Sequence, residues 1–490
     1  MSQTSLAPAG ARDAGEAPAR AGLSLAALSG LVVGSMVGGG VYSLPEAFGE
    51  ATGVLGALIA WAIAGTGMLM LALVFQTLSR RRPDIDAGIY GYAQAGFGAY
   101  VGFIAALSYW ASAFLGIVAL LVLAMSTLGT FLPAFGNGNT PLALVVASAL
   151  LWSYHLMLLR GVKEAASLNT IVTVAKLVPL AVFLVIVLAS ARADVFTANL
   201  LGGEGPAAPS LVEQVQRTML VVVFVFIGIE GASVYSRLAR RREDVGRATV
   251  IGFLGVLTLF VLVTVLSYAI LPRAELAALH NPSVAGVLAA IVGPPGRLFV
   301  SIGVLVSILG ALLAWSLLAA EVLFAAARRG SMPHFLAAQN SDGAPSAALW
   351  LTTLSIQLFL LMTLASSSAF RFFVELTSST ALIPYFFVAA FGLKLAWSGA
   401  TYAGAATERR RDVAVSALAT LCAAGMIYAG GIKVPLLSSL ILAPGTILFI
   451  LLRREQGAEI FTPVEWALAG AVVLAAGMAV WAIATGAIAV

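Results

Sequence analysis

Residues 34–45 read Gly-Ser-Met-Val-Gly-Gly-Gly-Val-Tyr-Ser-Leu-Pro, and they decide how this chain folds. They lie within an apolar segment, residues 24–45, that is long enough to cross a lipid bilayer as one helix. Each glycine of the central triplet costs a helix about 1 kcal/mol relative to alanine. We therefore predict that a membrane-spanning helix is interrupted here. The alternative is close helix packing through the small-xxx-small spacing of Gly34 and Gly38.

A second interruption lies in the other half of the chain, where residues 224–233 read Phe-Val-Phe-Ile-Gly-Ile-Glu-Gly-Ala-Ser. Here Gly228 and Gly231 flank a carboxylate, Glu230, within an apolar segment. Interrupted helices at matching positions in two halves are typical of secondary transporters built from inverted repeats. A broken helix exposes N–H groups that suit a carboxylate and C=O groups that suit an ammonium. An α-amino acid carries both of these charged groups on one carbon.

The composition of the whole chain is that of a multi-pass membrane protein. Of its 490 residues, 60% are hydrophobic and only 10% are charged, which is far from the soluble range. We count thirteen apolar segments of spanning length. They are residues 24–45, 53–78, 97–132, 141–159, 168–190, 214–236, 248–271, 297–327, 346–365, 371–396, 413–431, 434–452 and 463–488. Because each segment is long enough to cross the membrane as a helix, the chain is predicted to be all-α. Each interruption falls in the first segment of a five-segment block.

The segments divide the chain into a tail, a core and a C-terminal part. Residues 1–22 are predicted to form a disordered cytoplasmic tail, because the next apolar run reaches spanning length instead of ending at a signal-peptide cleavage site. The core is predicted at residues 23–397, with repeats at 23–190 and 214–397. Residues 398–490 are predicted to add about three C-terminal helices.

The side chains that most enzymes need are missing from the sequence. The single cysteine, Cys422, and three scattered histidines lack the spacing of a metal site. The glycine-rich stretch also lacks the strand–turn–helix setting of a nucleotide loop, and no channel filter is evident. We therefore expect no metal, no cofactor and no enzymatic activity. The net charge of +5 reflects membrane orientation rather than nucleic-acid binding.

Lysine and arginine are distributed unequally between alternate gaps. The N-terminal tail and the gaps after even-numbered segments hold 20 of them, and the other gaps hold 6; Lys176, inside a segment, completes the total of 27. The positive-inside rule places the N-terminus in the cytoplasm. We expect a multi-pass protein of the cell (inner) membrane whose odd number of segments leaves the C-terminus outside.

A third motif, Ala-Trp-Ser-Leu-Leu-Ala-Ala-Glu, occupies residues 314–321. With this motif and the two interrupted segments, the chain resembles the amino acid–polyamine–organocation superfamily. Within that superfamily it looks most like the basic amino acid/polyamine antiporters of the arginine/ornithine type. The resemblance covers the first ten segments and implies two inverted five-helix repeats with discontinuous helices 1 and 6. Members commonly have twelve spans, so the segment at residues 461–490 is an addition.

The resemblance also implies a substrate site at the two interruptions. Its implied substrate-binding residues are Ser35, Met36, Gly38, Gly39, Gly40, Tyr109, Ser112, Phe224, Ile227, Gly228, Trp315 and Thr377. The glycine-rich break would bind the carboxylate, and carbonyls of the second break would bind the α-ammonium. Trp315 would stack on the side chain, where a cation gains roughly 1–2 kcal/mol when desolvated, and Tyr109 would gate the site. Relatives place a tryptophan where this chain has Phe224 and, in some, an asparagine where it has Ile117.

Four ionisable residues lie within the apolar segments: Lys176, Glu230, Glu321 and Glu375. A charge inside the bilayer costs roughly 3 kcal/mol on insertion scales, so we treat all four as candidate coupling or gating residues. A structural pair or a snorkelling side chain is the alternative, most of all for Glu321 and Glu375 near segment ends. The resemblance implies that Lys176 takes the place of a sodium ion and that Glu230 relays the exchange between open states.

Two functions are consistent with these residues. The first is exchange of a cationic amino acid, arginine or lysine, for ornithine or a related amine by alternating access. The interior excess of carboxylates over the one ammonium favours such cationic substrates. The second is proton-coupled uptake of neutral amino acids, with Lys176 and Glu230 as the proton-linked groups. The expected partners are the small substrate and the lipid bilayer, and the sequence leaves open whether the chain forms a homodimer.

Overall fold

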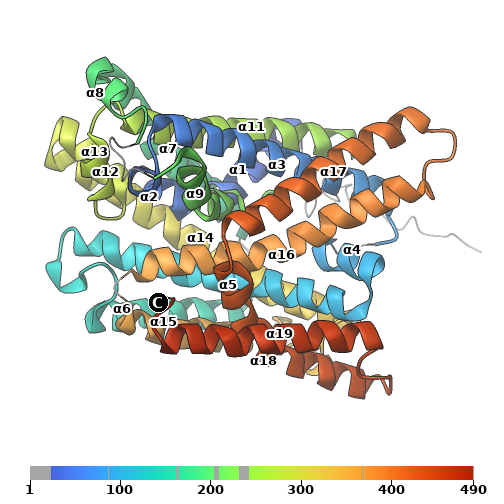
Figure 1. Ribbon diagram of the computed structural model, residues 1–490. Helices are drawn as coiled ribbons and strands as arrows, with labels where there is room; N and C mark the ends of the chain where they lie inside the picture. The colour runs from blue at the N-terminus through green and yellow to red at the C-terminus, as the bar shows by residue number, and fades with distance from the viewer. Residues whose placement is uncertain are drawn as a thin grey trace, which may run out of the picture.

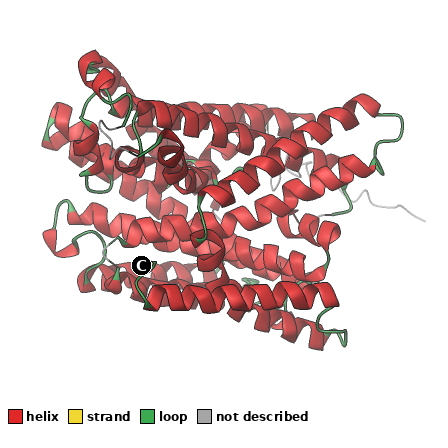
Figure 2. Ribbon diagram, viewed as in Figure 1, coloured by secondary structure: helices red, strands yellow, loops and turns green. Residues whose placement is uncertain are grey.

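The structure is a computed structural model, and it contains helices joined by turns and short loops (Figure 2). No β-strand occurs among the residues that it describes. Those residues are 24–85, 88–161, 165–202, 209–230, 242–366 and 368–488. The all-α prediction is confirmed. The predicted tail and residues 231–241, which include the part of the second interruption after Glu230, lie outside the described residues.

The helices follow the apolar segments closely (Figure 1). They are α1 (Leu25–Met36), the 3-10 helix η1 (Gly39–Ser43), α2 (Leu44–Ala51), α3 (Val54–Arg81), α4 (Gly88–Phe97), α5 (Ala99–Gly129), α6 (Pro141–Leu159), α7 (Ala165–Ala189), α8 (Ala193–Ala198), α9 (Leu211–Phe226), α11 (Arg242–Ser267), α12 (Arg273–Ala277), α13 (Ser283–Val292), α14 (Pro294–Arg328), α15 (Ser346–Met362), α16 (Ala369–Ser398), α17 (Ala406–Ala429), α18 (Lys433–Glu455) and α19 (Pro463–Ala484). Short 3-10 turns complete the loops.

Ten of the described helices are long and apolar enough to cross a membrane, and the bent pair formed by α1 and α2 would make eleven. The other two predicted segments correspond to α7 and α9. The apolar part of α7 measured in this way is Lys176–Ala189, which is shorter than a full span. The α9 helix has 16 residues, and its predicted segment continues into residues outside the described part. A multi-pass membrane protein is confirmed, and the count of thirteen spans stays a prediction.

The long helices form two groups that lie against each other (Figure 1). One group contains α1, α3, α9 and α11, and the other contains α5, α6, α14 and α15. Two helices connect the groups: α7 contacts α1, α11 and α14, and α16 contacts α3, α9 and α5.

The packing pairs repeat between the two halves of the chain. The contact of α1 with α11 has its counterpart in the contact of α9 with α3. Likewise α5 packs on α16 as α14 packs on α7, and α1 packs on α7 as α9 packs on α16. Each of these contacts therefore has an equivalent when the helices of the first half are exchanged with their counterparts in the second half.

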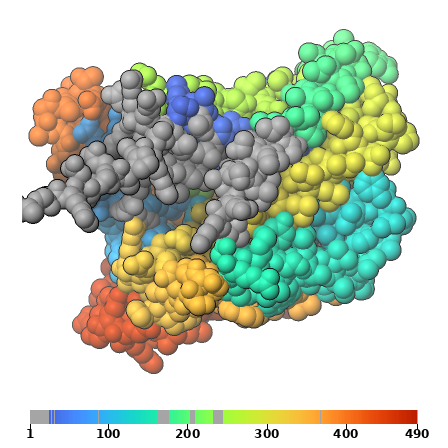
Figure 3. Space-filling model, turned by 180° about the vertical axis from the view of Figure 1, so that it is seen from behind, coloured from blue at the N-terminus to red at the C-terminus, as the bar shows by residue number. Residues whose placement is uncertain are grey.

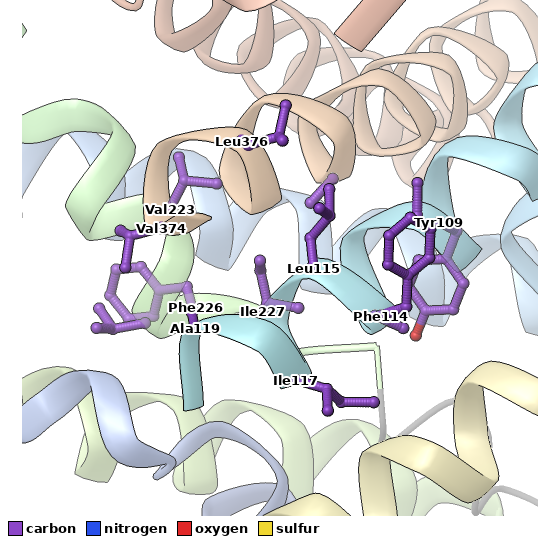
Figure 4. Packing of buried hydrophobic residues seen from close by; sticks show 14 of the residues in the cluster. Tyr109, Phe114, Leu115, Ile117, Ala119, Val223, Phe226, Ile227, Val374 and Leu376 are labelled. Atoms are coloured by element: carbon purple, nitrogen blue, oxygen red, sulfur yellow. The ribbon is translucent and has the colours of Figure 1, made fainter. Parts of the chain in front are cut away.

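The α5 helix lies at the centre of the bundle. In its most apolar stretch 89% of the residues are buried, whereas the corresponding figure for α19 is 17%. Figure 4 shows part of this hydrophobic cluster, in which Phe114 and Leu115 come from α5, Val223 from α9 and Leu376 from α16. Such low burial is expected for a helix that exposes most of its surface to lipid, as α19 does.

One end of the molecule carries α8, α12, α13 and the C-terminus, and the opposite end carries α4 (Figure 1). Figure 3 shows α8 and the α12–α13 region, in green and yellow, gathered at the first of these ends. Here Arg273 joins α12 to α2, because its Nε donates to Gly49 O at 2.9 Å and its Nη2 to Glu50 O at 3.0 Å. These carbonyls belong to the last turn of α2, where intrahelical donors are missing. Thus α2 and α12 are held together.

Candidate functional site

The first spanning helix breaks at the glycine triplet. The last α-helical hydrogen bond runs from Val37 N–H to Val33 O at 2.8 Å, and α1 ends at Met36. Gly38 is extended, with φ −109° and ψ −158°, and the chain then resumes as η1 and α2 at an angle of 49° to α1. The break leaves backbone N–H groups at the start of η1 and carbonyls at the end of α1 without the partners of a continuous helix.

The second break begins where α9 ends, at Phe226. Ile227 leaves the helical region with ψ 131°, and Gly228 has φ +108°, a conformation that residues with a side chain rarely adopt. A Cβ at Gly228 would also lie 2.7 Å from Ser35 O of the first break. Glycine is therefore required here both for the backbone angle and for the close approach of the two breaks.

A serine joins the two breaks directly. Ser35 Oγ donates to Gly228 O at 3.0 Å and lies 2.8 Å from Val32 O of its own helix. The two interrupted segments, 193 residues apart in the sequence, thus meet in the structure.

A small cavity of about 50 Å³ lies beside these breaks. It is lined by Ser35, Met36, Gly38, Gly39, Gly40, Val41, Ser112, Gly116, Leu120, Phe224, Val225, Ile227, Trp315 and Thr377. Ten of the twelve predicted substrate-binding residues are among them. The other two, Tyr109 and Gly228, contact residues of the lining, because Ser112 Oγ donates to Tyr109 O and Ser35 Oγ donates to Gly228 O. Ile117 is fully buried in the core and does not line the small cavity.

The walls of the small cavity are mostly apolar and carry no charged side chain. Hydroxyls come from Ser35, Ser112 and Thr377, and an indole comes from the half-buried Trp315. Thr377 is 2% exposed, and its Oγ1 has no hydrogen-bond partner among the described residues. A buried hydroxyl without a partner costs about 1–3 kcal/mol, so a ligand that bonds to Thr377 would recover this energy. No carboxylate lies among the lining residues.

A buried carboxylate lies next to the second break. Glu230 is 3% exposed, and it accepts hydrogen bonds from Tyr109 Oη at 2.6 Å and Tyr385 Oη at 2.7 Å. The backbone N–H of Gly228 donates to the same carboxylate at 3.3 Å. Glu230 therefore connects α5, α16 and the break itself. Our sequence reasoning missed Tyr385, although a tyrosine in an apolar segment signals a buried hydroxyl that needs a partner.

Lys176 connects the two parts of the first broken helix. Its side chain is 4% exposed, and Nζ donates to Gly34 O at 3.0 Å near the end of α1. Its backbone carbonyl accepts from Tyr42 Oη in η1 at 2.8 Å. An ammonium is favoured at this place because the last carbonyls of a helix carry partial negative charge.

The other two predicted coupling residues lie away from the small cavity. Glu321 is exposed on α14, about two turns before Arg328 at the end of that helix. The Glu375 side chain is 25% exposed and lies 3.3 Å from Arg371 Nε. Neither residue lines the small cavity, and their coupling or gating roles stay predictions. Among the described residues, no group of three or more His, Cys, Asp or Glu side chains could hold a metal ion.

A large cavity of about 360 Å³ lies on the far side of Phe224. Its charged lining residues are Glu46 and Glu50 of α2, Arg217 of α9 and Arg371 of α16. Phe224 lines both cavities, and a Cβ added to Gly40 would lie 2.7 Å from its ring. The phenyl ring thus separates the large cavity from the small one. The large cavity reaches residues 277–281, so it lies at the end of the molecule that carries α12.

Known proteins resemble this chain over most of its length. Residues 23–452 match the profile of a family described as amino acid permease. The arginine/ornithine antiporter of Pseudomonas aeruginosa is 49% identical over 95% of this chain and 98% of its own. The L-lysine transport protein of Corynebacterium glutamicum is 38% identical over 95% of each chain. The arginine/agmatine antiporter of Chlamydia abortus is 35% identical over 87% of this chain and 89% of its own.

Proposed function

This chain belongs to the amino acid permease family, and from that premise we propose that it exchanges arginine or lysine for ornithine or a related amine across the cell membrane. It is a membrane transporter rather than an enzyme. The similar proteins named above are described as carriers of basic amino acids, which supports a cationic substrate.

The observation that carries the proposal is the meeting of two helix breaks beside one small cavity. The N–H groups after the first break suit a carboxylate, and the carbonyls around the second break suit an α-ammonium. The substrate side chain would then lie against Trp315, Ser112 and Thr377. A cation over the indole face is attracted by the ring quadrupole.

We propose an inverted-repeat core, with repeats at residues 23–190 and 214–397, that alternates between two open states. The packing pairs that map onto one another support the repeat, and the small cavity lies between the two helix groups. Phe224 would close the small cavity from one side, while Tyr109, Tyr385 and Glu230 would close it from the other. With a cytoplasmic N-terminus, as the charge bias indicates, the large cavity opens to the outside.

Exchange follows if the empty carrier changes state slowly. A substrate shifts the equilibrium between states only through contacts that differ between them. Purified protein in liposomes tests this, because uptake of labelled arginine should need arginine or ornithine inside the vesicle. Equal uptake into vesicles without internal amino acid would rule out exchange.

Proton-coupled uptake of neutral amino acids is a second candidate, and one observation favours it. The small cavity has no carboxylate in its lining, so its walls do not require a cationic side chain. An inward proton gradient should then drive uptake of a neutral amino acid into empty vesicles. A competition series with arginine, lysine, ornithine, agmatine and neutral amino acids separates the two candidates.

A further inference from the structure

We propose that the large cavity is a second binding site, which receives the cationic side chain of a substrate before the substrate passes Phe224. The inference rests on the function proposed above and adds a site that the helix breaks do not provide. A volume of about 360 Å³ is within the range of pockets that hold small ligands. The small cavity, at about 50 Å³, is far below that range and would have to widen to hold a whole substrate.

Both arginines that line the large cavity are already paired with carboxylates. Arg217 forms an ion pair with Glu213 at 2.6 Å. Arg371 is shared between two carboxylates, because Nη1 pairs with Glu50 and Nε lies 3.3 Å from Glu375. Among the described lining residues, this leaves Glu46 as the carboxylate without an ion pair. An unpaired carboxylate in a concave surface attracts cations and raises their local concentration.

Glu46 provides the carboxylate that is open to a ligand. No lysine or arginine of the described residues lies within ion-pair distance of it, and Asn281 Nδ2 donates to its Oε2 at 3.2 Å. Glu46 begins α2 beside the glycine-rich break, and its backbone N–H donates to Ser283 Oγ at 3.1 Å. The carboxylate is therefore held at the wall of the large cavity.

An unpartnered acceptor lies next to this carboxylate. Asn281 lines the large cavity, and its Oδ1 is buried without a hydrogen-bond partner among the described residues. Its Nδ2 is already bonded to Glu46, so Oδ1 and the Glu46 carboxylate form two neighbouring acceptors. An ammonium or guanidinium group is a donor without acceptors, and it can bond to both. On the wall of the same cavity, the carboxylate of Glu50 already binds a guanidinium group, that of Arg371.

The linings of the two cavities suit different parts of the substrate. The small cavity has uncharged walls and suits the α-carboxylate and α-ammonium, whereas the large cavity has a carboxylate, Glu46, without an ion pair. Selection for a positive side chain then begins in the large cavity, before Phe224 moves. A partly solvated ion pair gives a modest gain, so we expect an effect of about two- to fivefold on apparent affinity.

The test compares Glu46→Gln with the wild-type protein in right-side-out proteoliposomes loaded with ornithine. At low ionic strength, the external arginine concentration that gives half-maximal exchange should rise about two- to fivefold in the variant. The difference should shrink at high salt, because screening weakens the pair. Asn281→Ala should shift the same value in the same direction, and Glu46→Asp, which keeps the charge, should shift it less.

The control variant is Glu275→Gln, which removes one charge from exposed α12 at the same end of the molecule. It should keep the wild-type concentration dependence. Equal half-saturation in Glu46→Gln and wild-type protein at low salt would overturn the inference, and so would an equal shift in Glu275→Gln. If the wild-type protein exchanges no arginine at all, the proposed function fails, and the inference falls with it.

Discussion

Gly38 is the position where a small substitution should separate substrate binding from folding. Its φ of −109° suits any residue, and a Cβ built there meets no atom within 4 Å. By contrast, a Cβ would lie 2.6 Å from Leu120 at Gly39 and 2.7 Å from Phe224 at Gly40. We therefore expect Gly38→Ala to keep the wild-type unfolding temperature, whereas Gly39→Ala and Gly40→Ala should lower it.

The expected loss of binding follows from the size of the small cavity. Gly38 lines this space of about 50 Å³, and a methyl group is comparable in size to a water molecule, whose share of liquid volume is about 30 Å³. Adding one methyl group to a filled site costs about 1–3 kcal/mol. That cost raises the dissociation constant for arginine about 5- to 150-fold.

Calorimetric titration with arginine and thermal unfolding of the same detergent-purified protein measure the two effects. Gly30→Ala is the matched control, since a Cβ at Gly30 of α1 also meets no atom within 4 Å. Wild-type arginine affinity in Gly38→Ala would refute the assignment of the small cavity as the substrate site. Equal losses in both variants would show that α1 tolerates no added side chain, and would refute the steric reasoning.

Three further substitutions test the contacts around the breaks. Gly228→Ala forces a side chain into a positive-φ conformation against Ser35, at a cost of about 1–3 kcal/mol. The unfolding temperature of the protein should therefore fall, and an unchanged unfolding temperature would contradict the close contact. Tyr385→Phe removes a hydrogen bond to Glu230 worth about 1–3 kcal/mol, and vesicle assays should show a changed exchange rate with little change in arginine affinity. Lys176→Met leaves a buried carbonyl of α1 without its donor, so the purified variant should have a lower unfolding temperature and a lower exchange rate. Wild-type values of both quantities would exclude a role for the ammonium.

The helix breaks could be predicted because their cause is local. Glycines in an apolar segment weaken the helix wherever it packs, and the structure ends α1 at Met36 and α9 at Phe226. The family resemblance supplied most residues that line the small cavity. Hydropathy alone gives the approximate depth of a residue and not the direction in which it points around its helix. For this reason the sequence did not indicate that the Glu321 side chain lies on an exposed face of α14.

The sequence contains no comparable signal for contacts between helices that are far apart along the chain. Tyr385 and Glu230 are 155 residues apart, and nothing in either segment indicates that their side chains meet. The same holds for Glu46 and Asn281, which are 235 residues apart. Such pairs depend on how helices are rotated and packed, which a single sequence does not state.

The attachment of α12 to α2 through Arg273 offers a way to observe the carrier at work. A spectroscopic label at Ala274, exposed on α12, would lie outside the linings of both cavities. Since α12 is bonded to the last turn of α2, the label should shift whenever that half-helix tilts. Distances from Ala274 to a second label on α19 would then record the opening and closing of the carrier in real time, without a change to the residues that line either cavity.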